Sequence, residues 1–178
     1  MAQFGGDTTI GAHIKLLMCD CFDTLVELST DRYHARKGVR AFLEHYTHTV
    51  RLPVVVVSDA RADHVAGALE QAGLSDFIER IFHADNGGIE DRDGVLYKRL
   101  DRVVTAYKLH PSEVMFIGDS RLDAAAAQEY HVNFIRVPGS LDRDFTFARL
   151  VGGASRYRSA EYSSEMLRQF MQDREQND

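Results

Sequence analysis

The chain has 178 residues, of which 44% are hydrophobic and 27% are charged, as is usual for globular domains. This length predicts one domain with a substantial core. The formal net charge of −6 argues against a general nucleic-acid-binding surface, and no apolar run is long enough to cross a membrane. We therefore expect neither a membrane nor nucleic acid as a general partner.

The only two cysteines, Cys19 and Cys21, stand two residues apart. A disulfide between such close neighbours would be strained, and a two-cysteine metal site would lack companion cysteines. We therefore expect buried free thiols in a reducing cytoplasm. Residues 1–13 have no basic-then-apolar secretory pattern and are expected to form a loose leader.

Apolar strand-like runs alternate with amphipathic segments along the chain. Buried strands are predicted at 16–19, 53–58, 114–117 and 132–137, with a shorter one before residue 83. Helices are predicted over 38–48, 61–72, 97–108 and 122–130, with a short one at 145–151. The stretches 26–36 and 85–94 are expected to be loops or small hairpins. This alternation predicts an α/β fold, a Rossmann-like parallel sheet with helices on both faces. We expect the domain to span 14–152, followed by a C-terminal helix and polar tail over 153–178.

Polar residues fall where the predicted strands end. Asp20, Ser58 and Asp119 each directly follow an apolar run, and Lys98 is expected to open the helix before the third of these strands. The carboxyl ends of parallel strands meet at one edge of a sheet, where open α/β sheets bind ligands. Two carboxylates, a hydroxyl and an ammonium are therefore expected in one pocket.

Two carboxylates held close together repel each other unless a cation or proton neutralises them. Mg²⁺ prefers oxygen ligands and commonly combines few carboxylates with phosphate oxygens. A carboxylate can itself attack phosphorus and form an aspartyl-phosphate, while a cation and a lysine neutralise the transferring group. The pocket therefore suits phosphoryl transfer.

The chain here resembles the haloacid dehalogenase-like (HAD) superfamily. Asp20-Cys-Phe-Asp-Thr24 is similar to its first motif, Asp-x-Asp-x-Thr, and Val54 to Ser58 is similar to the second. Lys98 fits the third, and Gly118-Asp119-Ser120-Arg-Leu-Asp123 resembles the fourth, which is the most specific. The resemblance covers about 15–137.

This resemblance implies that Asp20 is the nucleophile of a Mg²⁺-dependent phosphohydrolase. It implies that Asp20, the backbone carbonyl of Phe22 and Asp119 hold Mg²⁺, with Asp123 assisting through water or by orienting the lysine. Ser58, Thr24 and Lys98 would hold the phosphate. The spans 25–53 and 59–97 are filled by expected core elements, so no cap domain is predicted.

One departure concerns the general acid. The family's phosphatases carry a second Asp two residues after the nucleophile, whereas this chain has Phe22 there. Asp23 is the adjacent candidate, at a place often taken by Gly, and His34 or His64 is an alternative donor. An aromatic residue at position 22 also resembles the pattern of the family's dehalogenases, which use no metal. In this chain, however, Asp119 and Asp123 are retained, and these carboxylates suit a metal ion.

The sequence therefore predicts a capless HAD-type phosphatase acting on an unidentified phosphomonoester. It leaves open a macromolecular substrate and a homo-oligomer. The alternative is a catalytically weakened module that binds phosphate or a partner protein, and Phe22 is the residue that favours it. Dehalogenation is a third hypothesis.

Overall fold

Strand β1 (Leu16–Cys19) lies at the centre of a five-stranded sheet in the computed structural model, which describes residues 10–151. The order is β5-β4-β1-β8-β9 and every pairing is parallel. The other strands are β4 (Val54–Val57), β5 (Arg80–Phe82), β8 (Val114–Gly118) and β9 (Asn133–Arg136). The predicted α/β parallel sheet is confirmed. The helix and tail predicted over 153–178, and most of the predicted leader, lie outside the described residues.

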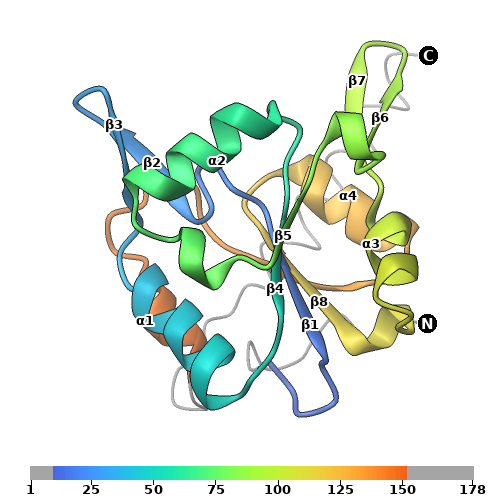
Figure 1. Cartoon of the computed structure of the whole chain (residues 1–178), viewed down its shortest axis with the longest axis horizontal. Helices are drawn as coiled ribbons and strands as arrows, with labels where there is room; N and C mark the ends of the chain where they lie inside the picture. Colours follow the sequence, from blue (N-terminus) through green and yellow to red (C-terminus); the bar gives the residue numbers. More distant parts are fainter. Residues whose placement is uncertain (1–9, 152–178) are drawn as a thin grey trace.

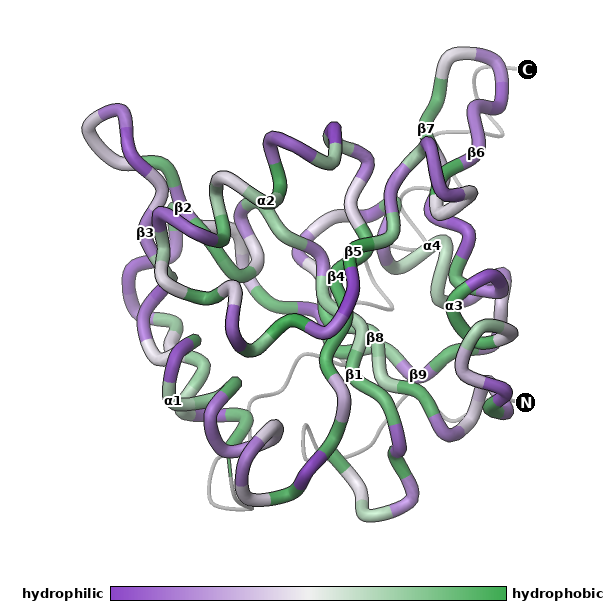
Figure 2. Tube along the Cα trace, in the orientation of Figure 1, coloured by the Kyte–Doolittle hydropathy of each residue, from purple (hydrophilic) through white to green (hydrophobic). Residues whose placement is uncertain are grey.

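The central strands are apolar at every position because both faces of the sheet are covered. All four residues of β1 and all four of β4 are buried. Side chains alternate between the faces, so Leu17 and Val54 join one core while Met18 and Val55 join the other. Figure 2 shows hydrophobic green along these central strands, with more hydrophilic colours at the loops around them.

Helices cover both faces, as predicted. The first core receives α1 (Val39–Glu44), which continues as a π-helical segment over His45–Thr49, and α2 (Ala62–Gln71). The second receives α3 (Leu100–Ala106) and α4 (Arg121–Glu129). Figure 1 shows the two pairs on opposite sides of the sheet. Short 3₁₀ turns complete the connections, at Ser75–Phe77, Ala84–Asn86, Pro111–Glu113 and Phe147–Leu150.

Two antiparallel hairpins flank the edge at which β1 ends (Figure 1). The first pairs β2 (Val26–Ser29) with β3 (Arg32–Ala35), and the second pairs β6 (Ile89–Arg92) with β7 (Val95–Lys98). In the second, the two-residue turn Asp93-Gly94 has φ values of 55° and 82°, which the tight turn of a hairpin requires at both positions.

The second hairpin corrects one prediction. The helix expected over 97–108 begins only at Leu100, and Lys98 is the last residue of β7 rather than the first of a helix. Val95 to Tyr97 are good strand formers, and the turn at Asp93-Gly94 supplies them with a partner strand. The lysine thus reaches the sheet edge from a hairpin.

The two cysteines are free and fully buried, as the sequence predicted. Burial raises the pKa of both thiols, and the negative charge of Asp20 adds to this. No helix within residues 10–151 combines the length and the apolar character that a membrane crossing needs.

Candidate active site

Three carboxylates meet at the carboxyl edge of the central strands. Asp20 follows β1 and Asp119 follows β8, which is its neighbour in the sheet. Asp123, in the first turn of α4, completes the group. One carboxylate oxygen from each residue lies within 4.8 Å of the others. Such a group concentrates negative charge at one point.

Lys98 is the cation that the structure places among them. Its Nζ lies 2.7 Å from Asp20 Oδ1 and 2.5 Å from Asp123 Oδ1. All three side chains are buried, and the ammonium also lies 5.7 Å from the centre of the Phe116 ring. Three carboxylates and one ammonium leave an excess of two negative charges when all are ionised.

Burial is the main influence on the electrostatics of this site. Burial raises the pKa of Asp20 to about 7; the charge of Lys98 opposes the rise and that of Asp123 adds to it. Burial also raises the pKa of Asp119, against the hydrogen bond from Thr24. For Lys98, burial acts to lower the pKa, but Asp20 and Asp123 outweigh it and the pKa is raised. The lysine is therefore a fixed positive charge.

Thr24 lies between the two strand-end carboxylates. Its Oγ1 is 3.0 Å from Asp119 Oδ1 and 3.4 Å from Asp20 Oδ2. The residue is fully buried, and its one hydroxyl proton goes mainly to the nearer oxygen. The structure thus gives Thr24 a positioning contact with the carboxylates, while the substrate contact expected from the sequence stays a prediction.

Asp123 is held by its own helix as well as by Lys98. Its Oδ2 accepts from the backbone amide of Ser120 at 3.1 Å, and the Ser120 hydroxyl accepts from the Asp123 amide at 3.0 Å, which is a capping box. The Ser120 hydroxyl also donates to Asp123 Oδ2, at 2.7 Å. Residue 118 must be glycine, because a Cβ there would lie 2.6 Å from Asp123 Oδ2. Both carboxylate oxygens of Asp123 are thereby engaged, which suits an indirect role better than direct metal ligation.

Asp119 and Asp20 keep the freer oxygens. Within residues 10–151, Asp119 Oδ2 accepts no side-chain hydrogen bond, and the side-chain contact of Asp20 Oδ2 is the long one from Thr24, at 3.4 Å. The backbone carbonyl of Phe22 likewise accepts no hydrogen bond in the described part of the chain, because the bridge between Phe22 and Val26 uses the groups of its neighbours. These oxygens and the surplus charge fit a divalent cation that prefers oxygen.

Ser58 and Asp23 complete the set named from the sequence. Ser58 directly follows β4, is fully buried and accepts from the amide of Ala60 at 3.3 Å. Asp23 has a left-handed backbone, φ 57°, at a position where glycine would be unstrained. Its carboxylate is exposed and accepts a hydrogen bond from the Ser140 hydroxyl.

Arg36 is a residue that sequence reasoning missed. It is buried, and its guanidinium donates to the carbonyls of Asp23, Thr24 and Gly139. It therefore joins the loop after β1 to the loop after β9. Its place just before an apolar helix is a weak signal, because its hydrogen-bond partners come from tertiary contacts that the local sequence does not reveal.

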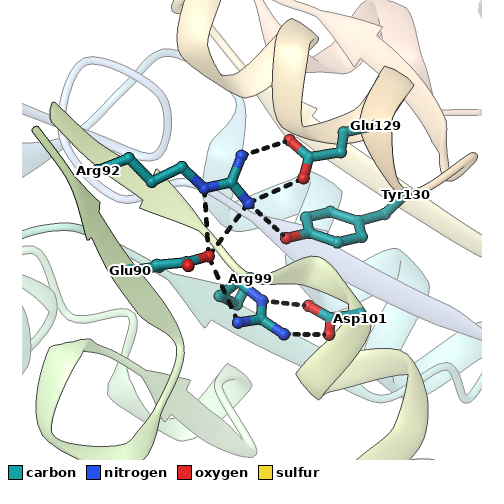
Figure 3. Close-up of polar contacts among 6 residues, drawn as sticks. All are labelled: Glu90, Arg92, Arg99, Asp101, Glu129 and Tyr130. Carbon is teal, nitrogen blue, oxygen red and sulfur yellow. Dashed lines mark hydrogen bonds and ion pairs between the residues drawn. The ribbon is translucent and has the colours of Figure 1, made fainter.

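An ion-pair network holds the hairpin that carries Lys98 (Figure 3). Its members are Glu90, Arg92, Arg99, Asp101, Glu129 and Tyr130. Arg92 bonds Glu129, at the end of α4, with both of its terminal nitrogens, at 2.8 and 3.1 Å. The hairpin is thus attached to both ends of α4, through Lys98 to Asp123 and through Arg92 to Glu129.

A family model for haloacid dehalogenase-like hydrolases matches residues 10–131. The chain belongs to this HAD-like hydrolase family. All four of its expected motifs, from Asp20 to Asp123, lie in the matched span.

A curated relative is described as a phosphatase. Over 95 residues the chain is 30% identical to the phosphoglycolate phosphatase of Photobacterium profundum, a match that covers 53% of this chain and 40% of that protein. It therefore spans less than half of that relative's length.

Solved structures share the fold. A HAD-like hydrolase from Streptococcus pneumoniae has a TM-score of 0.58 at 12% identity, over 75% of this chain and 90% of its own. A structure described as a predicted phosphoglycolate phosphatase from Haemophilus somnus has a TM-score of 0.59 at 14% identity, over 77% of this chain and 91% of its own. One described as a putative phosphoglycolate phosphatase from Lactobacillus plantarum has a TM-score of 0.59 at 15% identity, over 85% of this chain and 98% of its own. At these identities the likeness concerns the fold alone.

This HAD-like site has no carboxyl side chain at position 22. The Phe22 ring packs at 4.7 Å from the ring of His64 and at 5.3 Å from that of Tyr33, measured between centroids. His34, the other histidine considered as a proton donor, is exposed on β3 opposite Glu27. Of the two histidines, it is thus His64 whose ring contacts Phe22.

Proposed function

We propose that this HAD-like hydrolase is a Mg²⁺-dependent phosphomonoesterase that acts through an aspartyl-phosphate on Asp20. One observation carries the proposal: the carboxylates of Asp20, Asp119 and Asp123 lie together at the sheet edge, and Lys98, which pairs with Asp20 and Asp123, leaves an excess of two negative charges among these four groups when all are ionised. A cation plus a phosphoryl group balances that arrangement better than a neutral substrate does.

The covalent steps of the proposed reaction take place on Asp20. An Asp20 oxygen attacks phosphorus, the bond from phosphorus to the leaving oxygen breaks, and that oxygen departs with the electron pair. Lys98 holds Asp20 Oδ1 at 2.7 Å and so fixes the orientation of the attacking carboxylate. Water then attacks the phosphorus of the aspartyl-phosphate, releasing inorganic phosphate and restoring Asp20.

Asp20, Asp119 and the Phe22 carbonyl are the proposed Mg²⁺ ligands, with Asp123 behind them. Bound there, Mg²⁺ would neutralise charge on the transferring phosphoryl group. Ser58 and Lys98 are the proposed phosphate contacts, and Thr24 orients the two carboxylates. Asp23 is the weaker candidate for the acid, because its carboxylate is already hydrogen-bonded to Ser140.

A second candidate function is a HAD-like module that binds phosphate or a partner without turnover. The observation that favours it is Phe22, which cannot donate a proton. Dehalogenation is less well supported, since the acidic cluster suits a cation. We further propose a cytoplasmic location, which the two buried free thiols favour, and a phosphorylated compound as the substrate.

A panel of phosphomonoesters tests the proposal. Wild type should release phosphate with Mg²⁺ and lose this activity in EDTA, and Asp20→Asn should lose it under both conditions. If wild type does not exceed Asp20→Asn on any ester, while inorganic phosphate still binds, the binding module replaces the enzyme.

A further inference from the structure

Three aromatic rings from three separate elements meet beside the nucleophile. They belong to Phe22, to Tyr33 of β3 and to His64 of α2, and their centroids lie between 4.7 and 5.6 Å apart. The Tyr33 hydroxyl and His64 Nε2 are 2.8 Å apart, within hydrogen-bond distance. The backbone amide of Tyr33 also donates to Gln71 of α2, at 3.1 Å. The cluster is therefore fixed to the body of the domain.

The cluster lies at the same edge as Asp20. Phe22 is two residues beyond the nucleophile, in the loop that follows β1. His64 is in the first turn of α2, which begins just after Ser58 at the end of β4. The rings of Phe22 and Tyr33 are half-buried and His64 is exposed, so the cluster keeps a face that a ligand can contact.

The chemistry of the leaving group points the same way. With phenylalanine at position 22 and Asp23 bonded to Ser140, the departing oxygen has no free carboxyl group beside it. An alkoxide leaves poorly without a proton, whereas a phenol, with a pKa of about 10 as in tyrosine, leaves as a phenolate and takes its proton from water. A substrate whose leaving oxygen is attached to an aromatic ring needs no acid.

We propose that the substrates are aryl phosphomonoesters, whose ring packs against Phe22, Tyr33 and His64 while Asp20 attacks the phosphorus. This inference rests on the proposed phosphatase function and adds the substrate class to it. Aromatic pairs prefer offset or edge-to-face contacts at centroid separations such as those within this cluster, so a fourth ring extends the same packing.

The decisive experiment separates ring contact from leaving-group acidity. Phenyl phosphate is compared with the phosphate ester of a fluorinated alkanol of matched acidity. Because the two leaving groups are equally acidic, the ratio of their kcat/KM values reports the ring contact alone. We expect a preference of about tenfold for the phenyl ester, mainly in KM. Tyr33→Leu should abolish most of it and Tyr33→Phe should keep it.

A binding measurement covers the possibility that a variant turns over poorly. On Asp20→Asn, phenyl phosphate should bind several-fold more tightly than cyclohexyl phosphate, and Tyr33→Leu in that background should remove the difference. Circular dichroism checks that each variant is folded.

Two outcomes would overturn the inference alone. One is equal kcat/KM for the matched esters in wild type. The other is an equal loss of activity on the fluorinated and phenyl esters in His64→Phe. This variant keeps an aromatic ring, so such a loss would mean that His64 acts as a proton donor. Failure of wild type to exceed Asp20→Asn on either ester would overturn the proposed function and this inference together.

Discussion

Phe22 can serve one of two roles expected at its position: its backbone carbonyl can bind a cation, but its side chain cannot donate a proton. Its backbone carbonyl remains free of hydrogen bonds in the described chain and is available to a cation, while its side chain has become part of an aromatic cluster. Metal binding and attack by Asp20 are therefore expected to survive, whereas protonation of a poor leaving group is not.

Phe22→Asp tests this separation. The substitution should raise the rate on an alkyl phosphate by up to about 10²-fold, because it restores a carboxyl group beside the leaving oxygen, and should change the aryl rate little. Initial rates of both ester types measure the effect, with Asp20→Asn as the blank. Brisk alkyl hydrolysis by wild type would mean that Asp23, His34 or His64 already donates the proton.

Asp119→Asn tests the proposed cation ligand. Calorimetric titration should show Mg²⁺ affinity reduced by at least tenfold, since a charged oxygen with few competing contacts is lost. Asp63→Asn, which removes an exposed carboxylate paired with Arg61, is the matched control and should leave the affinity unchanged. If Asp119→Asn binds as tightly as wild type, the cation site lies elsewhere.

Among the elements, the β6–β7 hairpin has the clearest mechanical role. It presents Lys98 to the carboxylates, and the Arg92 to Glu129 pair fastens its far end to α4. Isolated surface ion pairs contribute little to stability, so the expected effect of the pair is local order in the hairpin.

Replacing Arg92 by Gln should therefore loosen the hairpin without unfolding the domain. Backbone amides of β6 and β7 should exchange with solvent several-fold faster, while those of β1, β4 and β8 keep their wild-type rates. Arg61→Gln, which removes the exposed pair with Asp63 at the start of α2, is the control. Uniformly faster exchange in all strands would contradict a local role.

The hairpin also marks where sequence patterns stopped being sufficient. Continuous apolar runs identified the central strands. The polar residue directly after each run identified the candidate site residues Asp20, Ser58 and Asp119. Lys98 was expected to open a helix because residues 97–108 have helical spacing, and the competing strand needs a partner strand that periodicity does not reveal. Arg36 was missed for a similar reason, since its acceptors are carbonyls of loops distant in sequence.

For the molecule as a whole, the buried carboxylates couple folding to pH. Burial raises the pKa of Asp20 to about 7 and raises that of Asp119, whereas an unfolded aspartate titrates near about 4. The metal-free folded state therefore binds these protons more tightly than the unfolded chain does. The contribution of Asp20 to the free energy of unfolding is full below about pH 4 and is lost as the pH rises through about 7. That of Asp119 is lost as the pH rises through its raised pKa.

Thermal unfolding measured by circular dichroism checks this expectation. In EDTA, the midpoint temperature of wild type should decrease as the pH is raised from about 5 to about 8. The midpoint temperature of Asp20→Asn should decrease less over the same range. Added Mg²⁺ should raise the wild-type midpoint, more at high pH because it competes with the protons. A wild-type midpoint in EDTA that rises across this range would contradict the assignment.

The burial of the chain's only two cysteines has a practical consequence for labelling. Their raised pKa values keep both thiols protonated, and only the thiolate reacts with thiol reagents. The native wild-type protein should therefore take up no label from a chromogenic disulfide reagent until it is denatured. Leu141 is 92% exposed, one residue after the Ser140 that bonds Asp23. A cysteine placed there would be the one reactive thiol of the folded chain, and a dye on it would follow the loop beside the site during turnover.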